Sequence, residues 1–262
     1  MNKKLIIFDM DGTIYLGNDL IDGAKETFSF LKKNNIDYAF FTNNSSHDLE
    51  FYYSKMKAFG IECDLEKNFY SSSEVTISYL LEKGAKDVFV IGNKSLKNKF
   101  SKHFILIDEY SKDIKIDAVI AGFSTELVYK ELMDACLFLE TRNIPFIATN
   151  GDYRCPIEDK LFIPDCGGMC EWIRLCTGKK ALVLGKPNAE IVDYLAKEFK
   201  VNKEEVLVVG DRLYTDILVG VNAKVDTVCV LSGESTQEDV DAYEAKPTYT
   251  IESIKSLPDL LI

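Results

Sequence analysis

The sequence is poor in histidine, because its 262 residues include only His47 and His103. Chemistry that depends on imidazole therefore has little material here. Long hydrophobic runs are also lacking: a run such as Leu5–Phe8 stops at Asp9, whereas a membrane-spanning helix needs ~20 apolar residues. The same acid interrupts the apolar centre of any signal peptide, so we expect no export signal, no membrane partner and a cytoplasmic protein.

Positive charge is in deficit, since 31 lysine and arginine residues face 42 aspartate and glutamate residues and leave a net charge of −11. Such a chain repels a phosphodiester backbone, so we expect no nucleic-acid partner. With 47% hydrophobic and 28% charged residues, the composition is otherwise that of a folded globular protein. This length allows one large domain or two modest ones, and needs no disulfide to hold a core.

The seven cysteines lack the spacing of a typical zinc site. Four of them crowd into one stretch, namely Cys155, Cys166, Cys170 and Cys176. No CxxC pair occurs and no histidine lies nearby, so small buried hydrophobic side chains are favoured over zinc ligands. An odd number of cysteines in a chain without an export signal favours free thiols.

Short apolar runs alternate with amphipathic stretches, which is typical of parallel strands joined by crossover helices. The outer runs suit strands buried on both faces, and they are Leu5–Phe8, Tyr38–Phe41, Val206–Val209 and Thr227–Leu231. A second set fills the middle of the chain: Val88–Ile91, Phe104–Ile107, Ala118–Ala121, Phe146–Thr149 and Ala181–Leu184. A single sheet of all these strands would exceed the usual ~5 to 6, so the middle block is predicted to be an inserted domain.

We therefore predict an α/β fold with a doubly wound, parallel-sheet core of residues 1–83 and 185–262. A large α/β domain of residues 84–184 is inserted into it. Apolar residues at helical spacing predict helices near residues 24–31, 49–59, 127–139 and 191–199. Ser71 and Glu74 form a capping-box pattern before a further helix that ends near Lys83.

Polar motifs follow the outer strands, where open α/β sheets bind their ligands. They are Asp9-Met10-Asp11-Gly12-Thr13, Thr42-Asn43-Asn44, Gly185-Lys186-Pro187, and Gly210-Asp211-Arg212 with Asp216. Each has an ordinary interpretation when taken singly: a turn at the Asp-Gly pair, a helix cap at Thr42, an exposed loop at Lys186. Four such elements at one predicted sheet edge favour a functional site.

Four carboxylates and one lysine would converge at that edge. Crowded carboxylates repel one another, so they must take up protons or hold a cation. The motifs offer oxygen ligands and neither histidine nor cysteine, which favours Mg²⁺. The Lys186 ammonium, the Thr42 hydroxyl and strand-end N–H groups would bind an anion, and a phosphoryl group fits this arrangement.

These motifs, continued by Ser45-Ser46 and by Leu213-Tyr214-Thr215-Asp216-Ile217, resemble those of the haloacid dehalogenase-like superfamily. The specific resemblance is to its class IIA branch, the NagD-like or p-nitrophenyl phosphatase type. It spans the chain, because the insertion lies between the second and third motifs as the cap domain of that branch does. It implies a Mg²⁺-dependent phosphatase of small phosphorylated metabolites, such as sugar phosphates, nucleoside monophosphates or phosphoglycolate. It also implies a homodimer joined through the cap.

The resemblance assigns catalytic and metal-binding roles. Asp9 would attack phosphorus and form an aspartyl-phosphate, and Asp11 would protonate the leaving group and then activate water. The Mg²⁺ would be held by Asp9, the Asp11 carbonyl, Asp211 and Asp216. Because a dehalogenase releases halide without needing a proton, the presence of Asp11 favours phosphate esters.

The resemblance also assigns substrate contacts. The residues expected at the phosphoryl group are Gly12, Thr42, Asn43 and Lys186. In the insertion, Thr149–Arg154 resembles a cap loop with an Asn-x-Asp pattern, so Asn150 and Asp152 would contact substrate; a plain Asn-Gly turn is the alternative. Pro164–Gly168 departs from the usual form of the branch, and Lys224 replaces a usual glycine, which bears on the substrate and not on the chemistry.

Two other classes of function stay open. The first is a phospho-accepting signalling domain, which also gathers acids, a threonine and a lysine at strand ends. Such a domain needs only ~120 residues and carries its acceptor on a middle strand, whereas here the acidic pair follows the first strand. The second is a catalytically silent binding protein, although a complete acidic cluster is costly to retain without use.

Overall fold

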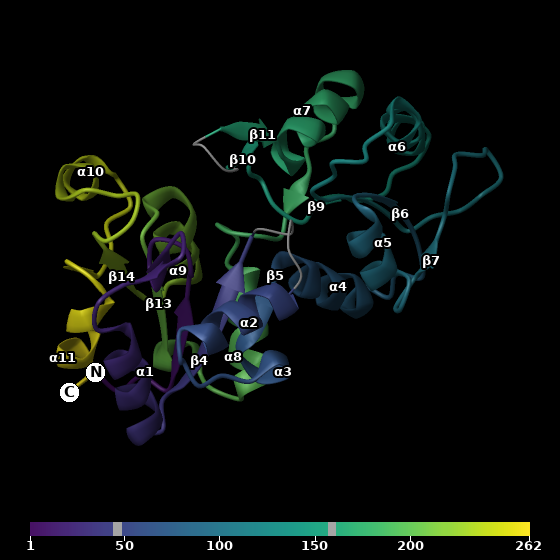
Figure 1. The fold of residues 1–262 in the computed structure, drawn as a ribbon. Helices are drawn as coiled ribbons and strands as arrows, with labels where there is room; N and C mark the ends of the chain where they lie inside the picture. The colour runs from purple at the N-terminus through teal and green to yellow at the C-terminus, as the bar shows by residue number, and fades with distance from the viewer. Residues whose placement is uncertain (44–48, 157–160) are drawn as a thin grey trace. The chain divides into compact units, whose positions relative to one another are not determined.

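The computed structural model describes residues 1–43, 49–156 and 161–262, so Asn44, Ser45 and Ser46 of the second motif lie outside the described residues (Figure 1). The chain forms two compact units. Of the described residues, the first unit contains 1–42, 49–71 and 186–262, and the second contains Asn43 and residues 72–185. Each unit has a parallel sheet of its own.

The sheet of the first unit has six strands in the order β15-β14-β13-β1-β4-β5. Its strands are β1 (Leu5–Phe8), β4 (Asp37–Thr42), β5 (Phe69–Ser71), β13 (Val206–Gly210), β14 (Asp226–Val230) and β15 (Tyr249–Ile251). All neighbours are parallel, and β1 lies between β4 and β13 with Phe8 beside Phe40 and Val209. A small antiparallel pair, β2 (Tyr15–Leu16) and β3 (Asp19–Leu20), follows β1.

Helices cover both faces of this sheet. They are α1 (Ala24–Lys33), α2 (Leu49–Ala58), α3 (Leu65–Asn68), α8 (Glu190–Phe199), α9 (Leu218–Ala223), α10 (Gln237–Ala242) and α11 (Leu257–Leu261). The buried face of α1 is set by the spacing of Ala24, Phe28 and Leu31, which pack on the sheet face that carries Phe8. On the other face, α9 approaches so closely that a Cβ on Gly220 would lie 2.2 Å from Thr227 of β14.

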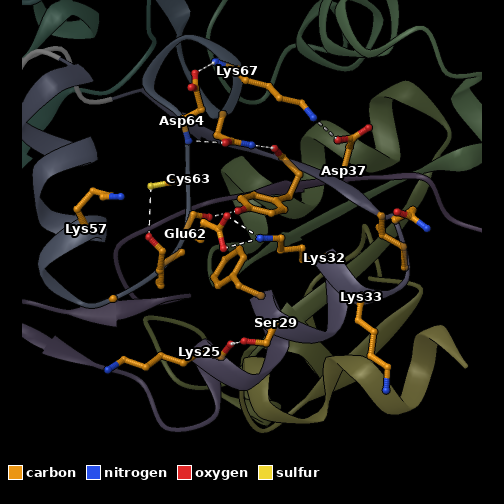
Figure 2. Close-up of a pocket in the computed structure, with 17 residues that line it drawn as sticks. Lys25, Ser29, Lys32, Lys33, Asp37, Lys57, Glu62, Cys63, Asp64 and Lys67 are labelled. Atoms are coloured by element: carbon orange, nitrogen blue, oxygen red, sulfur yellow. Dashed lines mark hydrogen bonds and ion pairs between the residues drawn. The ribbon is translucent and has the colours of Figure 1, made fainter.

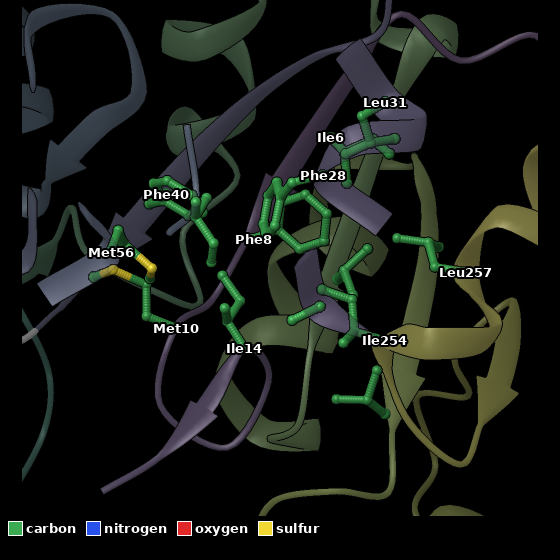
Figure 3. Packing of buried hydrophobic residues seen from close by; sticks show 14 of the residues in the cluster. Ile6, Phe8, Met10, Ile14, Phe28, Leu31, Phe40, Met56, Ile254 and Leu257 are labelled. Atoms are coloured by element: carbon green, nitrogen blue, oxygen red, sulfur yellow. The ribbon is translucent and has the colours of Figure 1, made fainter. Parts of the chain in front are cut away.

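Aromatic rings fill the core beneath α1 (Figure 3). The ring of Phe28 lies 5.2 Å from that of Phe8 and 5.5 Å from that of Phe40, measured between centroids. Phe40 also contacts Phe69 of the edge strand at 4.8 Å. Such tilted and edge-on pairs add to the stability gained from burying apolar surface. This core fixes β1 and β4, and with them the residues that follow their carboxyl ends.

The second unit has a five-stranded parallel sheet in the order β12-β9-β8-β6-β7. Its strands are β6 (Asp87–Ile91), β7 (Ile105–Leu106), β8 (Ala118–Ala121), β9 (Phe146–Ala148) and β12 (Leu182–Val183), with an antiparallel pair β10 (Arg154–Pro156) and β11 (Phe162–Pro164). Its helices are α4 (Ser72–Glu82), α5 (Lys94–Phe100), α6 (Tyr129–Thr141) and α7 (Cys166–Thr177). Phe89 of β6 and Phe138 of α6 meet in its core at 5.3 Å.

The structure confirms the predicted α/β fold with parallel sheets and a second α/β unit. The second unit begins at Ser72 and not near residue 84, so it includes α4. An ion pair between Glu74 of α4 and Lys99 of α5 joins these two helices. The other boundary falls at Gly185, one residue from the predicted one. The division into a catalytic domain and a specificity domain remains a prediction.

Candidate active site

The first motif continues β1 into a tight turn. Asp9 is held at the strand end because its backbone N–H donates to the Val209 carbonyl at 2.9 Å. The Met10 carbonyl then accepts from the N–H groups of Thr13, Ile14 and Tyr15. Gly12 takes a left-handed conformation (φ +86°), and a Cβ there would lie 2.3 Å from Asp211 Oδ2. Glycine is therefore required at this position by both backbone and space.

The fourth motif places two more carboxylates at the neighbouring strand end. Asp211 follows β13 directly, and a short π-helical turn, Leu213–Ile217, carries Asp216 back toward it. A Cβ on Gly210 would lie 2.2 Å from the Asp216 Cβ, so only glycine allows this approach. Asp216 Oδ2 accepts from the Arg212 backbone N–H at 3.0 Å, which fixes the carboxylate.

Lys186 joins these acids. Its buried ammonium lies 2.5 Å from Asp9 Oδ1 and 2.9 Å from Asp216 Oδ1. The ammonium also lies 5.8 Å from the centroid of the Phe41 ring. Burial alone lowers the pKa of Lys186, but attraction to Asp216 and Asp9 outweighs it, so the pKa is raised and the lysine is fully charged.

The cluster is richer in acid than one lysine can neutralise. One carboxylate oxygen from each of Asp9, Asp211 and Asp216 lies within 4.8 Å of the others. Burial raises the pKa of Asp9 to about 6, although Lys186 opposes the shift. Burial raises the pKa of Asp211 to about 8, with repulsion from Asp9 and Asp216 adding to it. Ionisation of all three acids therefore calls for a further cation.

A hard divalent cation fits this cluster. Its ligands are carboxylate oxygens, which Mg²⁺ prefers. Asp211 Oδ1 is buried and has no hydrogen-bond partner among the described residues. A buried oxygen without a partner is suited to bind a cation. Among the described residues, these three aspartates are the one group of acidic, histidine or cysteine side chains close enough together to hold a metal ion. No cysteine belongs to this group.

Three other predicted residues belong to the same unit. Asp11 is exposed in the turn after Asp9, and its carboxylate is not part of the three-acid cluster. The Gly12 N–H donates to the Tyr15 carbonyl at 2.7 Å, so it offers no free donor to an anion. Thr42 is buried at the end of β4, in register with Ser71.

The predicted substrate residues of the insertion lie together in the second unit. Asn43 donates through Nδ2 to Asp152 Oδ2 at 3.2 Å, and its carbonyl accepts from Asn150 Nδ2 at 3.2 Å. Asn150 is buried, and its Oδ1 has no hydrogen-bond partner among the described residues. Asp165 Oδ1 accepts from Asn150 Nδ2 at 3.4 Å, and burial raises the pKa of Asp165 to about 6.

Two residues near Asp211 were not predicted as site residues. Arg212, which belongs to the fourth motif but was assigned no role, is a partly buried cation that Asp9, Asp211 and Asp216 attract. Its Nε lies 2.9 Å from a Glu234 oxygen. Glu234 belongs to the segment after β14, which reaches the same sheet edge, so the rule that ligands lie at strand ends would have pointed to it.

A separate groove lies at the amino end of β4, whereas the acidic cluster lies beyond the carboxyl ends of β1 and β13 (Figure 2). Its volume is about 1030 Å³, and it is lined by residues at the amino end of β4, including Asp37 and Tyr38. Lys32 pairs with Glu62 and Lys67 with Asp37, each at 2.6 Å (Figure 2). Its lysines in the last turns of α1 and α2 complement the negative helix ends.

Three of the four crowded cysteines are buried: Cys155, Cys166 and Cys170. All seven cysteines are free thiols, and the Cys166 and Cys170 sulfurs lie 3.8 Å apart. Cys176 is exposed and contacts Cys136 of α6. Within the described residues, no helix is both long and apolar enough to cross a bilayer.

Comparisons with known proteins identify the family of this chain. A model described as haloacid dehalogenase-like hydrolase matches residues 6–104, and one described as HAD-hydrolase-like matches residues 183–257. The acid sugar phosphatase of Staphylococcus haemolyticus is 31% identical over 254 residues, which cover 97% of this chain and 94% of that protein.

Solved structures of other proteins superimpose on nearly the whole length of this chain. The 4-nitrophenylphosphatase of Thermotoga maritima is 36% identical, with a TM-score of 0.89 over 98% of this chain and 97% of that one. NagD of Escherichia coli K-12 is 28% identical, with a TM-score of 0.87 over 97% of this chain and 98% of that one. The chain belongs to the haloacid dehalogenase-like hydrolases, in their NagD-like phosphatase branch.

Proposed function

We propose that this protein is a Mg²⁺-dependent phosphatase of small phosphate monoesters, with Asp9 as the nucleophile. The observation that carries the proposal is the contact of Lys186 with Asp9 and Asp216 beside Asp211. Lys186 neutralises part of the charge around Asp9 and keeps its carboxylate available for attack. Positioning and charge neutralisation account for most phosphoryl-transfer catalysis.

The reaction would run in two displacements. A carboxylate oxygen of Asp9 bonds to phosphorus while the bond from phosphorus to the ester oxygen breaks, and Asp11 donates a proton to that oxygen. Water then attacks the aspartyl-phosphate with Asp11 as the base, which releases phosphate and restores Asp9. Lys186 and Thr42 would bind the phosphoryl oxygens during both steps, with Gly12 beside them and Asn43 positioning them.

The metal would be held by Asp9, the Asp11 carbonyl, Asp211 and Asp216, with the free Asp211 Oδ1 among its ligands. When bound, Mg²⁺ supplies positive charge to the phosphoryl oxygens. Lys186 contributes the same charge from a fixed side chain, because its ammonium is buried between two acids. The raised pKa values of Asp9 and Asp211 support a site built to be neutralised by a cation.

For substrates, we favour sugar phosphates, which the name acid sugar phosphatase suggests for relatives of this chain. Nucleoside monophosphates and phosphoglycolate remain candidates. The core residues would contact only the phosphoryl group, so selectivity would come from the second unit. Asn150 and Asp152 are the residues we assign to it, and the buried, unpaired Asn150 Oδ1 could accept a hydrogen bond from a substrate hydroxyl.

We also propose a homodimer formed through the second unit. Along α6, Tyr129, Met133 and Leu137 are exposed at intervals of four residues, so they share one face. On α7, which packs against α6, Trp172 is 63% exposed and Leu175 is 72% exposed. Exposed apolar patches are common where proteins contact one another, which supports the proposed dimer. Seven free thiols support our assignment of the protein to the cytoplasm.

The decisive experiment is hydrolysis of p-nitrophenyl phosphate with Mg²⁺ and with EDTA. We expect turnover in Mg²⁺, its loss in EDTA, and its loss in Asp9→Asn, whereas the exposed control Asp19→Asn keeps wild-type activity. Equal, slow hydrolysis by wild type and Asp9→Asn would overturn the proposal. A label from acetyl phosphate that persists on Asp9 for minutes would instead support the signalling alternative.

A further inference from the structure

The segment after β14, residues 231–235, touches both carboxylate motifs of the first unit; we call it the β14 loop. The Ser232 hydroxyl donates to the Gly12 carbonyl at 2.9 Å. The Glu234 backbone N–H donates to Asp211 Oδ2 at 2.8 Å. The Ser235 N–H donates to the Asp211 carbonyl at 3.2 Å. One short loop therefore joins the turn after β1 to the acid after β13.

Two glycines enclose the Asp211 carboxylate. A Cβ on Gly233 would lie 2.1 Å from Asp211 Oδ2, and a Cβ on Gly12 would lie 2.3 Å from the same oxygen. The Gly12 Cβ would also lie 3.1 Å from the Gly233 Cα, so the two backbones are nearly in contact. Oδ2 is thus confined by backbone on two sides and held by the Glu234 N–H, while Oδ1 keeps no partner among the described residues.

The Glu234 side chain anchors the loop from outside. One of its oxygens accepts from the Tyr214 hydroxyl at 2.8 Å, and the other lies 2.9 Å from Arg212 Nε. Both partners belong to the segment that follows Asp211, so the loop and the fourth motif are tied on two sides. The Asp211 carboxylate consequently has little freedom to rotate.

We propose that Ser232 and Gly233 are positioning residues that hold the Asp211 carboxylate with Oδ1 free, and so set the affinity of the site for a divalent cation. The inference rests on the proposed function. A ligand fixed before binding loses less conformational entropy when the cation arrives. Groups that orient metal ligands through hydrogen bonds typically change metal affinity ~10- to 100-fold when they are removed.

Two substitutions test the two contacts. Gly233→Ala places a methyl group against Asp211 Oδ2, and we expect it to weaken Mg²⁺ binding at least ~10-fold. Ser232→Ala removes one hydrogen bond and should weaken binding roughly 2- to 10-fold, whereas Ser232→Thr keeps the hydroxyl and should bind as wild type does. The measurement is the dissociation constant for Mg²⁺ alone, by isothermal titration calorimetry.

Matched controls separate positioning from general damage. Gly168→Ala adds a methyl group whose nearest neighbour is 3.8 Å away, and Ser29→Ala removes a hydroxyl that also donates to a carbonyl, in α1. Both should bind Mg²⁺ as wild type does. Thermal unfolding in EDTA is measured on every variant, because a loop with only a structural role would lower the melting temperature and leave the Mg²⁺ affinity of the folded protein unchanged.

The outcomes distinguish the two proposals. If wild type binds Mg²⁺ but Ser232→Ala and Gly233→Ala bind it within twofold of wild type, the positioning role is overturned and the proposed function stands. If Gly233→Ala does not fold, the comparison of Ser232→Ala with Ser232→Thr decides the question alone. A wild-type protein that binds no Mg²⁺ would overturn the proposed function, and the positioning role with it.

Discussion

Lys186 Nζ lies 2.5 Å from Asp9 Oδ1 although 177 positions separate the two residues in the chain. Asp9 directly follows β1, and Lys186 is the first residue with which the chain re-enters that unit. Their contact therefore forms at the point where the chain returns from the second unit to the first.

The Asp11→Asn variant should lose activity unequally on two substrates. With an alkyl phosphate we expect kcat to fall ~10²- to 10⁴-fold, because the departing alkoxide needs a proton. With p-nitrophenyl phosphate the loss should be far smaller, since nitrophenolate leaves without one. Steady-state kinetics on both substrates give the comparison, and Asp19→Asn is the control. Equal losses on the two substrates would exclude the acid role.

The metal-free protein should become less stable as pH rises from about 4 to 8. The folded-state pKa values of Asp9 and Asp211 are raised to about 6 and about 8, so the folded state holds protons that the unfolded state has released. Stability from this source is complete below the unfolded pKa of ~4 and is lost as pH rises through the folded values. Urea unfolding in EDTA at a series of pH values measures it.

In the same titration, Asp211→Asn should flatten the decline between about pH 6 and 8, where the folded Asp211 carboxyl titrates. Asp113→Asn, which changes an exposed acid outside the cluster, is the control. Added Mg²⁺ should stabilise wild type most at the high-pH end, because binding needs ionised ligands. A stability that rises with pH in EDTA would contradict the electrostatic account of the cluster.

The Phe40→Ala variant should destabilise the first unit by ~3 to 5 kcal/mol. Phe40 is fully buried and its ring contacts those of Phe8, Phe28 and Phe69, so truncation removes apolar contacts and leaves a cavity. Urea unfolding followed by circular dichroism gives the free energy. Phe51→Ala is the matched control, because Phe51 is 42% exposed, and its change should stay below ~1 kcal/mol.

Lys224→Gly should stabilise the protein. Lys224 ends α9 in the left-handed conformation, with φ +60°, which glycine adopts more easily than any residue with a Cβ. We expect a gain of ~0.5 to 1 kcal/mol, reduced from the full steric benefit by the greater freedom of glycine in the unfolded chain. Lys33→Gly should instead lower the free energy of unfolding, because Lys33 lies in the helical conformation of α1. If both substitutions changed the free energy of unfolding in the same direction, this explanation would be wrong.

Leu175→Glu should convert the proposed homodimer into a monomer. The side chain is 72% exposed on α7, so a charge there does not disturb the core, but a charge buried in an apolar contact is costly. Analytical ultracentrifugation at micromolar concentration gives the mass. Leu16→Glu, on a residue 59% exposed in the first unit, is the control. A wild-type protein that sediments as a monomer at all accessible concentrations would rule out the dimer.

Hydrophobic patterning predicted the strands that are buried on both faces. Leu5–Phe8 and Ala118–Ala121 appear in the structure with the predicted bounds, because a short run made only of apolar residues is buried as a strand covered on both faces. The edge strands β5 and β15 were missed. Each has three residues and mixes aromatic or apolar with polar side chains, so its pairing depends on the neighbouring strand and not on its own pattern.

Strand order explains what could be predicted of the site. Asp9 and Asp211 had to meet once β1 and β13 were parallel neighbours, since both acids follow carboxyl ends. The contacts of the β14 loop could not be predicted in this way, because Ser232 reaches Gly12 through the path of an irregular segment. The boundary at Ser72 was also beyond sequence patterning, since it depends on how α4 packs and not on its periodicity.

The position of β1 between β4 and β13 has a consequence for biosynthesis. β1 leaves the ribosome before both of its neighbours and can pair with β4 once that strand has emerged, but its other neighbour begins only at Val206. Until translation has passed that point, one backbone edge of a fully apolar strand stays uncovered, and such edges invite aggregation or chaperone binding. A nascent chain arrested before Val206 should therefore be inert as an enzyme and dependent on cellular folding assistance.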